Sequence, residues 1–328
     1  KDSRSNYLFN TTISGIDKSD LILLIGANTR VNSSIINARI RKNYINRNID
    51  ILSISSSKFD LLFKYNYLGD NINVLNDLVD SNKFSQNHFK KFNYPMMIVG
   101  DEVLNHEQSE SIQMKCMEIL DKLGGFRKDW NGYNILHNTA SSVGSLDILG
   151  KYTNFNHQEL IKECNKEKIK FVYLLAADEM NCDYNNAFVV YQGHHGDVGA
   201  QKADVILPGS AYTEKSGIFL NLEGRLQITE RAVFPPGEAK EDWSIIRALS
   251  EYLGKKINYN NIEEVRDGLF NEISYIKSFK QGKFNTKPKF NLIGQLKSSK
   301  LIGNNKKFFM TCSISRSSLT MAECIKHL

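Results

Sequence analysis

The 328-residue sequence predicts an α/β protein with two lobes, each built on a parallel sheet. Up to residue 256, short apolar runs alternate with amphipathic segments, which is the pattern of parallel strands joined by right-handed helical crossovers. The chain also exceeds the roughly 250 to 300 residues at which a single core stops growing. Its longest clean apolar run, residues 21–26, is far shorter than the roughly 20 residues that span a bilayer, so no membrane insertion is expected.

The first lobe is expected at residues 1–150, and its N-terminal side is expected to be incomplete. Buried strands are predicted at 21–26, 49–55 and 94–104, with a weaker strand starting at 134. A turn at Gly26 and Asn28 leads into a helix within 31–47, whose apolar residues recur at helical spacing: Ile35, Ile36, Ala38, Ile40 and Tyr44.

Two further helical patterns in this lobe cover residues 74–82 and 107–125. The second pattern ends at Gly124 and Gly125, and it carries one apolar face formed by Ile112, Cys116, Ile119, Leu120 and Leu123. Strands and helices therefore alternate throughout the lobe, as a parallel sheet requires.

The second lobe is expected at residues 151–256, with strands at 169–180, 185–193 and 203–209. A helix follows at 241–256, ended by Gly254, with one stripe formed by Trp243, Ile246, Leu249, Ser250 and Leu253. Periodicity weakens after residue 257, so residues 257–328 are expected to form an extended linker, most clearly at 277–291, and a C-terminal tail.

Charge and cysteine content exclude several kinds of partner. The net charge of +6, from 42 basic and 36 acidic residues, is spread along the chain, so no nucleic acid is expected as a partner. The five cysteines stand singly, without a CxxC pair that could hold zinc or an iron–sulphur cluster: Cys116, Cys164, Cys182, Cys312 and Cys324. They are expected to be reduced thiols.

The segment "GANTR", residues 26–30, is a candidate anion site, because a glycine turn that opens a helix points backbone N–H groups at a ligand. It lacks the GxGxxG spacing of a dinucleotide site and the GK[ST] of a phosphate loop. A plain turn between strand and helix is the favoured interpretation, and a free-standing nucleotide-binding regulator is an alternative that depends on this segment alone.

His194, His195 and Asp197 stand close enough in sequence to suggest one metal ion. Adjacent histidines in an extended segment point to opposite sides, however, and the third ligand would be cramped. The favoured interpretation is a loop at the carboxyl end of a parallel strand, with His195 and Asp197 bonding the backbone or capping the next helix.

The carboxylates of "AADEMN", Asp178 and Glu179, could do acid–base work, but structural capping is favoured because no partner base is evident. No Ser/His/Asp or Cys/His set can be assembled from spacing. The sequence therefore predicts no catalytic residue, no cofactor-binding residue and no metal ligand in this chain.

Several motifs together resemble the C-terminal, molybdopterin-oxidoreductase-like part of the large iron–sulphur subunit of respiratory complex I, NADH:ubiquinone oxidoreductase. They occur in order along the chain: "SRSNYLFNTTISGIDKSDLILLIGANTR", "NARIRK", "YNILHNTASSVGSLDILG", "VYLLAADEM", "YQGHHGDVGAQKADVILPGSAYTEKSGIFLNLEGRLQ", "PPGEAKEDWSIIRALSEYLG" and "ISRSSLTMAECIK". The resemblance is weakest at 55–95 and 257–300. It implies two Rossmann-like lobes with parallel sheets, molybdopterin-oxidoreductase-like, plus an irregular C-terminal extension.

The resemblance also implies a function. In molybdopterin enzymes the stretch that resembles residues 203–225 embraces the pterin–nucleotide cofactor, whereas here it would be an inherited scaffold without cofactor. His194 stands where the family commonly has a small residue, and Ile218 where threonine is frequent. The family's iron–sulphur clusters would belong to a preceding N-terminal part or a partner chain, because the cysteine motifs that hold them do not occur among these five cysteines.

The expected role is a structural and assembly part of the peripheral arm of mitochondrial complex I, on the matrix side of the inner membrane. It would support electron transfer from NADH to ubiquinone without carrying a redox centre. Its expected partners are the cluster-bearing N-terminal half of the same subunit, in a split gene or as the missing part of a truncated sequence, and other peripheral-arm subunits. The alternative is a fragment of a molybdopterin-dependent oxidoreductase of the formate-dehydrogenase kind.

Overall fold

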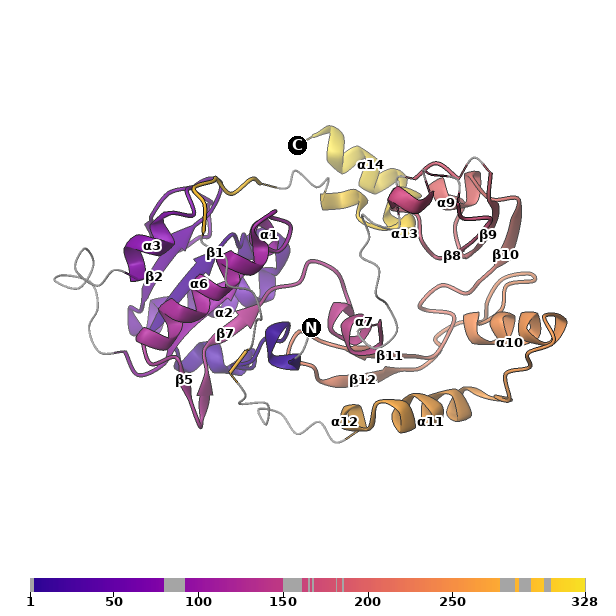
Figure 1. Ribbon diagram of the computed structural model, residues 1–328, viewed down its shortest axis with the longest axis horizontal. Helices are drawn as coiled ribbons and strands as arrows, with labels where there is room; N and C mark the ends of the chain where they lie inside the picture. The colour runs from indigo at the N-terminus through magenta and orange to yellow at the C-terminus, as the bar shows by residue number, and fades with distance from the viewer. Residues whose placement is uncertain are drawn as a thin grey trace. The chain divides into compact units, whose positions relative to one another are not determined.

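The computed structural model describes residues 3–79, 92–149, 161–164, 166, 168–180, 182–184, 186–277, 287–288, 296–303 and 308–327. The chain forms two compact units (Figure 1). The first comprises residues 1–150, 220–226 and 279–305, and the second comprises 151–219, 227–278 and 306–328. Among the described residues, no helix combines the length and the apolar character that a membrane crossing needs.

The first unit is built on a parallel sheet with strand order β3-β2-β1-β4-β7. The chain order reverses direction between β1 and β4, which is the position where open α/β sheets commonly bind ligands. The strands are β1 (Leu21–Ile25), β2 (Asp50–Ile54), β3 (Asn66–Tyr67), β4 (Pro95–Val99) and β7 (Tyr133–Ile135).

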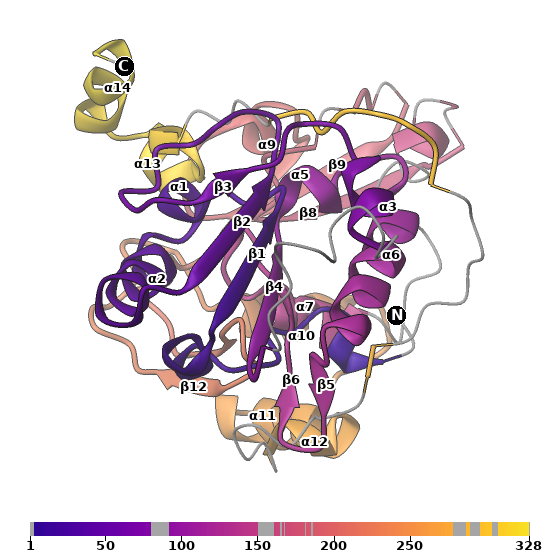
Figure 2. The same ribbon diagram turned by 90° about the vertical axis from the view of Figure 1, so that its left-hand side faces the viewer.

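Helices cover both faces of this sheet (Figure 2). Alternate residues of β1 point to opposite sides: Leu21, Leu23 and Ile25 pack in a core with α3 (Val74–Val79) and α6 (Ser109–Lys122). Ile22 and Leu24 pack in a second core with α2 (Ser34–Arg47). Burial on both faces explains why β1 is a continuous apolar run rather than an alternating one. The unit also contains η1 (Arg4–Asn6), η2 (Ser14–Lys18), α1 (Thr29–Asn32), α5 (Asp101–Leu104), β5 (Phe126–Arg127), β6 (Trp130–Asn131) and α7 (Ser142–Leu149).

The strands predicted at 21–26, 49–55 and 134 are confirmed, but the strand predicted over 94–104 is wrong in its second half. β4 ends at Val99, and residues 101–104 form the short helix α5 after Gly100. The apolar Val103 and Leu104 continue the pattern of a strand, yet they belong to the core beside α6. The helix predicted at 74–82 is confirmed as α3 up to residue 79, and residues 80–82 lie outside the described residues.

The buried face of α2 also differs from the predicted one. Ile35 is 76% exposed and Ala38 is exposed, whereas Asn37 and Asn43 are buried with Ile36 and Ile40. The reason is hydrogen bonding: Asn37 donates to the carbonyl of Leu61, and Asn43 donates to the carbonyls of Ile16 and Ser19. Buried amides that satisfy loop carbonyls replace apolar residues here. The predicted face of α6 is confirmed, with Leu123 half-buried.

The second unit is built on a smaller parallel sheet with strand order β10-β9-β8. Each of the three predicted strands contains one observed strand, but the one predicted over 169–180 is wrong in its last part, because β8 ends at Leu175 and residues 176–180 form a loop. A short helix follows β9. The elements are β8 (Phe171–Leu175), β9 (Phe188–Gly193), α9 (Val198–Gln201), β10 (Val205–Pro208), β11 (Gly217–Leu220), β12 (Leu226–Thr229), α10 (Asp242–Tyr252), α11 (Ile262–Glu272), α12 (Ser274–Lys277), η3 (Phe308–Met310), α13 (Ser313–Arg316) and α14 (Leu319–Lys326).

The helices of the second unit bury little of their apolar surface. Ser250 is the buried residue of α10, and in the described structure α11 and α14 have no buried residue. The stripe predicted for α10 therefore exists, but its apolar residues are half-buried or exposed, with Leu253 69% exposed. Residues 262–277, which the periodicity leaves in an extended linker, form α11 and α12. The clearest linker stretch, 277–291, lies mostly outside the described residues.

Candidate functional site

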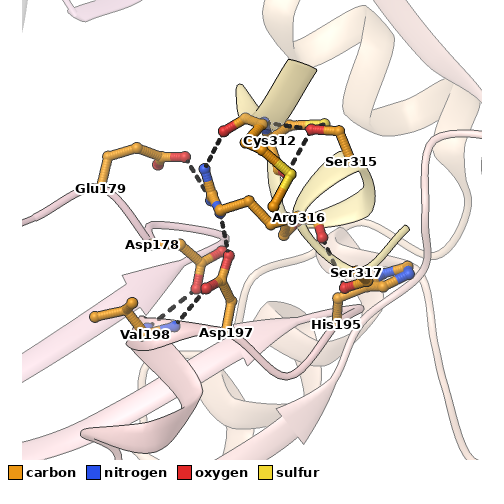
Figure 3. A network of polar contacts seen from close by, with 12 residues as sticks. Asp178, Glu179, His195, Asp197, Val198, Cys312, Ser315, Arg316 and Ser317 are labelled. Carbon is orange, nitrogen blue, oxygen red and sulfur yellow. Dashed lines mark hydrogen bonds and ion pairs between the residues drawn. The ribbon is translucent and has the colours of Figure 1, made fainter. Parts of the chain in front are cut away.

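The loops that follow β8 and β9 meet at the carboxyl edge of the second sheet (Figure 3). This edge carries the acidic residues that the sequence singled out: Asp178 and Glu179 after β8, and Asp197 after β9. We call these three residues the acidic edge. Parallel sheets commonly bind ligands at this edge, so the contacts of the three carboxylates decide what the unit can hold.

Two of the three carboxylates cap the start of α9. Asp197 is the N-cap residue, and its Oδ1 accepts a hydrogen bond from the backbone N–H of Val198 at 2.9 Å. Asp178 Oδ1 accepts from the backbone N–H of Gly199 at 3.1 Å, while its Oδ2 accepts from the hydroxyl of Tyr191. Burial raises the pKa of Tyr191, so this hydroxyl keeps its proton and donates. The predicted capping roles of Asp178 and Asp197 are confirmed.

Arg316 of α13 binds the acidic edge from the C-terminal part of the chain. Its Nε donates to Asp197 Oδ2 at 2.5 Å, and one terminal nitrogen donates to Glu179 Oε1 at 2.9 Å (Figure 3). The other terminal nitrogen donates to the carbonyl of Met310 at 3.4 Å. The planar guanidinium fork thus reaches two carboxylates from different loops and one backbone carbonyl of its own segment.

Asp197 has a shifted pKa because of these contacts. Burial raises the pKa of this carboxyl, but the hydrogen bonds from Arg316 and from the N–H of Val198 outweigh burial and lower it below its usual range. A carboxyl with a lowered folded pKa stabilises the fold above its unfolded pKa of about 3.9. That contribution is lost as the pH falls through the lowered folded value, so the contact is present at neutral pH and is weakened only in acid.

No local pattern in the sequence marks Arg316, which lies 119 residues after Asp197. It stands in "ISRSS", which contributed to the family resemblance but carried no chemical signal of its own. An arginine in a tail that was expected to be irregular cannot be paired with a carboxylate by spacing. Only the tertiary structure brings the two together.

The two histidines contact each other, which corrects the expectation that they point to opposite sides. The Nδ1 atoms of His194 and His195 are 2.7 Å apart, and the rings are nearly perpendicular. Burial, then His195 and Lys215, hold the pKa of His194 below its usual range. Asp197 turns away to cap α9 and bind Arg316, so the three predicted metal candidates do not converge. Among the described residues, no group of three or more His, Cys, Asp or Glu side chains could hold a metal ion.

The charged loop after β10 bonds to its own unit. Lys215 pairs with Asp242 at the start of α10, and Asp242 accepts a hydrogen bond from the buried side chain of Gln192 at 2.8 Å. Glu214 accepts from the backbone N–H of Ala211 at 2.9 Å, which closes the loop on itself. Glu214 and Lys215 are therefore engaged in contacts that stabilise the loop.

The turn "GANTR" lies in the first unit, at the point where the strand order reverses. Its residues also bond internally: the Asn28 side chain caps α1, the Thr29 hydroxyl donates to Asn37, and Arg30 pairs with Asp60. These contacts match a plain turn between strand and helix, the favoured interpretation of the sequence.

Two buried carboxylates stand beside this turn. Asp101, which accepts from the side chain of Asn32, is 8% exposed, and Glu102 is 6% exposed. Glu102 accepts hydrogen bonds from the N–H and hydroxyl of Ser56, but burial outweighs them and raises its pKa. An anionic phosphate at this strand end would therefore lie against acidic side chains, which opposes its binding.

A hollow of about 710 Å³ lies elsewhere in the first unit, between the end of α2 and the segment 58–66. Half-buried aromatic side chains line it: Tyr44, Phe59, Phe63 and Tyr65. Its charged side chains are exposed, namely Asp50, Lys58, Asp60 and Lys64, and Asp60 already pairs with Arg30. We assign no catalytic role to this hollow.

Residues 1–252 match the family model of molybdopterin oxidoreductase, and residues 280–324 match the C-terminal model of the NADH-ubiquinone oxidoreductase G subunit. The chain is 42% identical over 98% of its length to the G subunit of NADH-quinone oxidoreductase from Rickettsia prowazekii, of which it covers 46%.

Two further relatives show similar sequence identity and coverage. The chain is 40% identical over 98% of its length to the NADH-ubiquinone oxidoreductase 75 kDa subunit of Reclinomonas americana, covering 47% of it. It is 42% identical over 99% of its length to the mitochondrial NADH-ubiquinone oxidoreductase 78 kDa subunit of Candida albicans, covering 45%. The chain spans about half the length of these curated relatives.

Proposed function

Because the chain belongs to the molybdopterin oxidoreductase family and contains the C-terminal module of the NADH-ubiquinone oxidoreductase G subunit, we propose that it is a scaffold part of the peripheral arm of complex I. Its role is to support the half of the subunit that carries the iron–sulphur clusters. It takes no part in the chemistry between NADH and ubiquinone. The acidic side chains at its strand ends carry this proposal.

Both strand-end edges oppose an anionic cofactor. Asp101 and Glu102 stand beside the turn after β1 in the first unit, and the acidic edge stands at the strand ends of the second. A pterin–nucleotide cofactor carries a pyrophosphate, which is stabilised by N–H groups and cations and is destabilised by nearby carboxylates. The one guanidinium at the second edge among the residues described here, that of Arg316, already binds two carboxylates. We therefore propose that the chain holds no pterin cofactor.

Metal analysis tests this proposal. We expect the complex that contains this chain to carry no stoichiometric molybdenum, measured by inductively coupled plasma mass spectrometry. We also expect its iron content to stay unchanged when the five cysteines of this chain are replaced by alanine, because no group of three or more His, Cys, Asp or Glu side chains among the described residues could hold a metal ion. The cysteines at 116, 164 and 182 are also buried in the fold. Unchanged circular dichroism would serve as the folding control. Stoichiometric molybdenum, or loss of iron in the folded variant, would contradict a scaffold role.

The poorly buried helices of the second unit support a permanent partner. The stripe of α10 is half-buried to exposed, Tyr252 is 92% exposed, and Phe234 in the preceding loop is 78% exposed. Large exposed apolar side chains that gather on one surface mark an interaction site. We propose that the partners are the cluster-bearing N-terminal half of the same subunit and other peripheral-arm subunits, on the matrix side of the inner mitochondrial membrane. Relatives that match this chain include a mitochondrial subunit and bacterial ones.

Co-expression tests the partner. Expressed alone, the chain is expected to aggregate or to unfold at low temperature, since a permanent interface of more than roughly 2,000 Å² would be left open. Co-expression with the cluster-bearing half is expected to give a soluble complex with a higher melting temperature. The control is co-expression with an unrelated soluble protein. A monodisperse chain that melts cooperatively without any partner would refute the proposed permanent interface.

A further inference from the structure

The C-terminal segment, defined here as residues 308–327, is attached to the second unit while the apolar side chains of residues 309–327 are only half-buried or exposed. It contains η3, α13 and α14, and none of residues 309–327 is buried. Leu319 at the start of α14 is 85% exposed. Figure 1 shows these helices (yellow) at the side of the second unit that carries α9. Hydrophobic burial is the usual source of docking energy, and because it is only partial here, a polar interaction has to supply part of that energy.

Arg316 supplies that interaction. Its guanidinium donates hydrogen bonds to Asp197 and Glu179, and its remaining terminal nitrogen donates to the carbonyl of Met310. The Asp197 side chain is 13% exposed and that of Arg316 is 25% exposed, so the pair is partly shielded from water. Charge-assisted hydrogen bonds in such surroundings are stronger than those of exposed ion pairs.

The acidic edge is held in place by contacts other than those to Arg316. Asp178 and Asp197 are positioned by the backbone N–H groups at the start of α9 and, for Asp178, by Tyr191. Glu179 lies next to them in the same loop as Asp178. Three carboxylates gathered by two loops repel one another unless a cation lies between them. The surface therefore favours a planar cation that can reach two carboxylates at once.

We propose that the acidic edge is a guanidinium-binding surface and that its occupant is the chain's own C-terminal segment. Arg316 anchors this segment at the strand ends, where an α/β fold would otherwise bind a ligand. The segment overlaps the family module matched at residues 280–324. Docking of residues 308–327 on the second unit thus depends on one arginine, and it is separable from the folding of the sheet beneath it.

Hydrogen exchange measured by mass spectrometry on the full chain, in the complex in which it is purified, tests this proposal. In Arg316→Ala, amide protection of residues 313–326 is expected to fall about ten- to hundredfold, because hydrogen bonds to charged groups are lost. In Arg316→Lys the protection is expected to fall less, since the ammonium group keeps the positive charge but lacks the planar fork that reaches two carboxylates. Protection of β9 is expected to stay unchanged in both variants.

Asp197→Asn separates the ion pair from the helix cap. Asparagine caps helices about as well as aspartate, so α9 is expected to keep its protection while the C-terminal segment loses it. The matched control is Lys326→Ala, which removes an exposed ion pair with Glu323 on α14. In this variant amide protection is expected to stay within about twofold of wild type at every position.

Three results would overturn the proposal. Protection of residues 313–326 could stay within about twofold of wild type in both Arg316→Ala and Asp197→Asn, which would show that the guanidinium does not hold the segment. Lys326→Ala could loosen the segment as much as Arg316→Ala does, which would remove the specific role of the guanidinium. Protection of β9 could fall together with that of α14, which would show that the segment is not a separable module.

Discussion

Gly100→Ala is expected to destabilise the first unit severely, by more than about 3 kcal/mol, because no space exists for a side chain where β4 passes the turn after β1. A Cβ atom on Gly100 would lie 2.3 Å from the carbonyl oxygen of Gly26 and 2.6 Å from the Cα of Ala27. That carbonyl also accepts a hydrogen bond from the N–H of Glu102, so it cannot move away without losing the bond. The expected result is a large drop in the urea midpoint of the chain or of the complex that carries it.

Gly196→Ala is the matched control, because a Cβ atom at Gly196 meets nothing within 4 Å. This variant is expected to stay within about 0.5 kcal/mol of wild type. The backbone of Gly100 has φ of −107°, which any residue can adopt, so the difference between the variants isolates the steric contact. A Gly100→Ala protein with an unchanged midpoint would show that the two turns separate more easily than the structure implies.

The second large effect is expected at the ion pair between Arg4 and Asp147. Arg4 Nε and one of its terminal nitrogens donate to both carboxylate oxygens of Asp147, at 2.7 to 3.1 Å, and Tyr7 donates to the same carboxylate at 2.5 Å. The side chains of Arg4 and Asp147 are 8% and 0% exposed. Truncating one partner of a buried pair leaves the other charge in a dry site, so Arg4→Ala or Asp147→Ala is expected to cost about 3 to 5 kcal/mol.

The double variant Arg4→Met with Asp147→Leu is expected to lose less stability than either alanine variant, since it removes both buried charges together. Arg39→Ala is the surface control. Arg39 forms an ion pair with Asp17, and the two side chains are 36% and 44% exposed, respectively. Loss of this pair is expected to cost at most about 1 kcal/mol of stability. Urea midpoints of all four variants, read by circular dichroism, check these values. A single alanine variant no less stable than the surface control would show that the buried pair is not needed to hold η1 against α7.

The family and fold class could be read from the sequence, and the comparisons confirm both. The elements recovered best were those whose residues pack on every side, such as β1, or on one continuous face, such as α6. In these elements each residue's place follows from its polarity and from the local period of the chain. Tertiary contacts changed the structure where they conflicted with the local pattern. α5 forms in place of the end of a predicted strand, and Asn37 and Asn43 take the place of apolar residues on the buried face of α2.

The capping of α9 by Asp197 followed from the sequence because a cap acts on backbone groups one to three residues away. The partner of the same carboxylate on its other side did not follow, because Arg316 is 119 residues distant and nothing local marks it. Likewise the contact between His194 and His195 depends on how the loop turns after β9. The sequence by itself determined the longer strands of the two parallel sheets, the helices α2, α3, α6 and α10 and the cap of α9, since these depend on short-range patterns of polarity and hydrogen bonding. Only the tertiary structure decided which distant charges meet at the strand ends, because that pairing depends on how the chain folds back on itself.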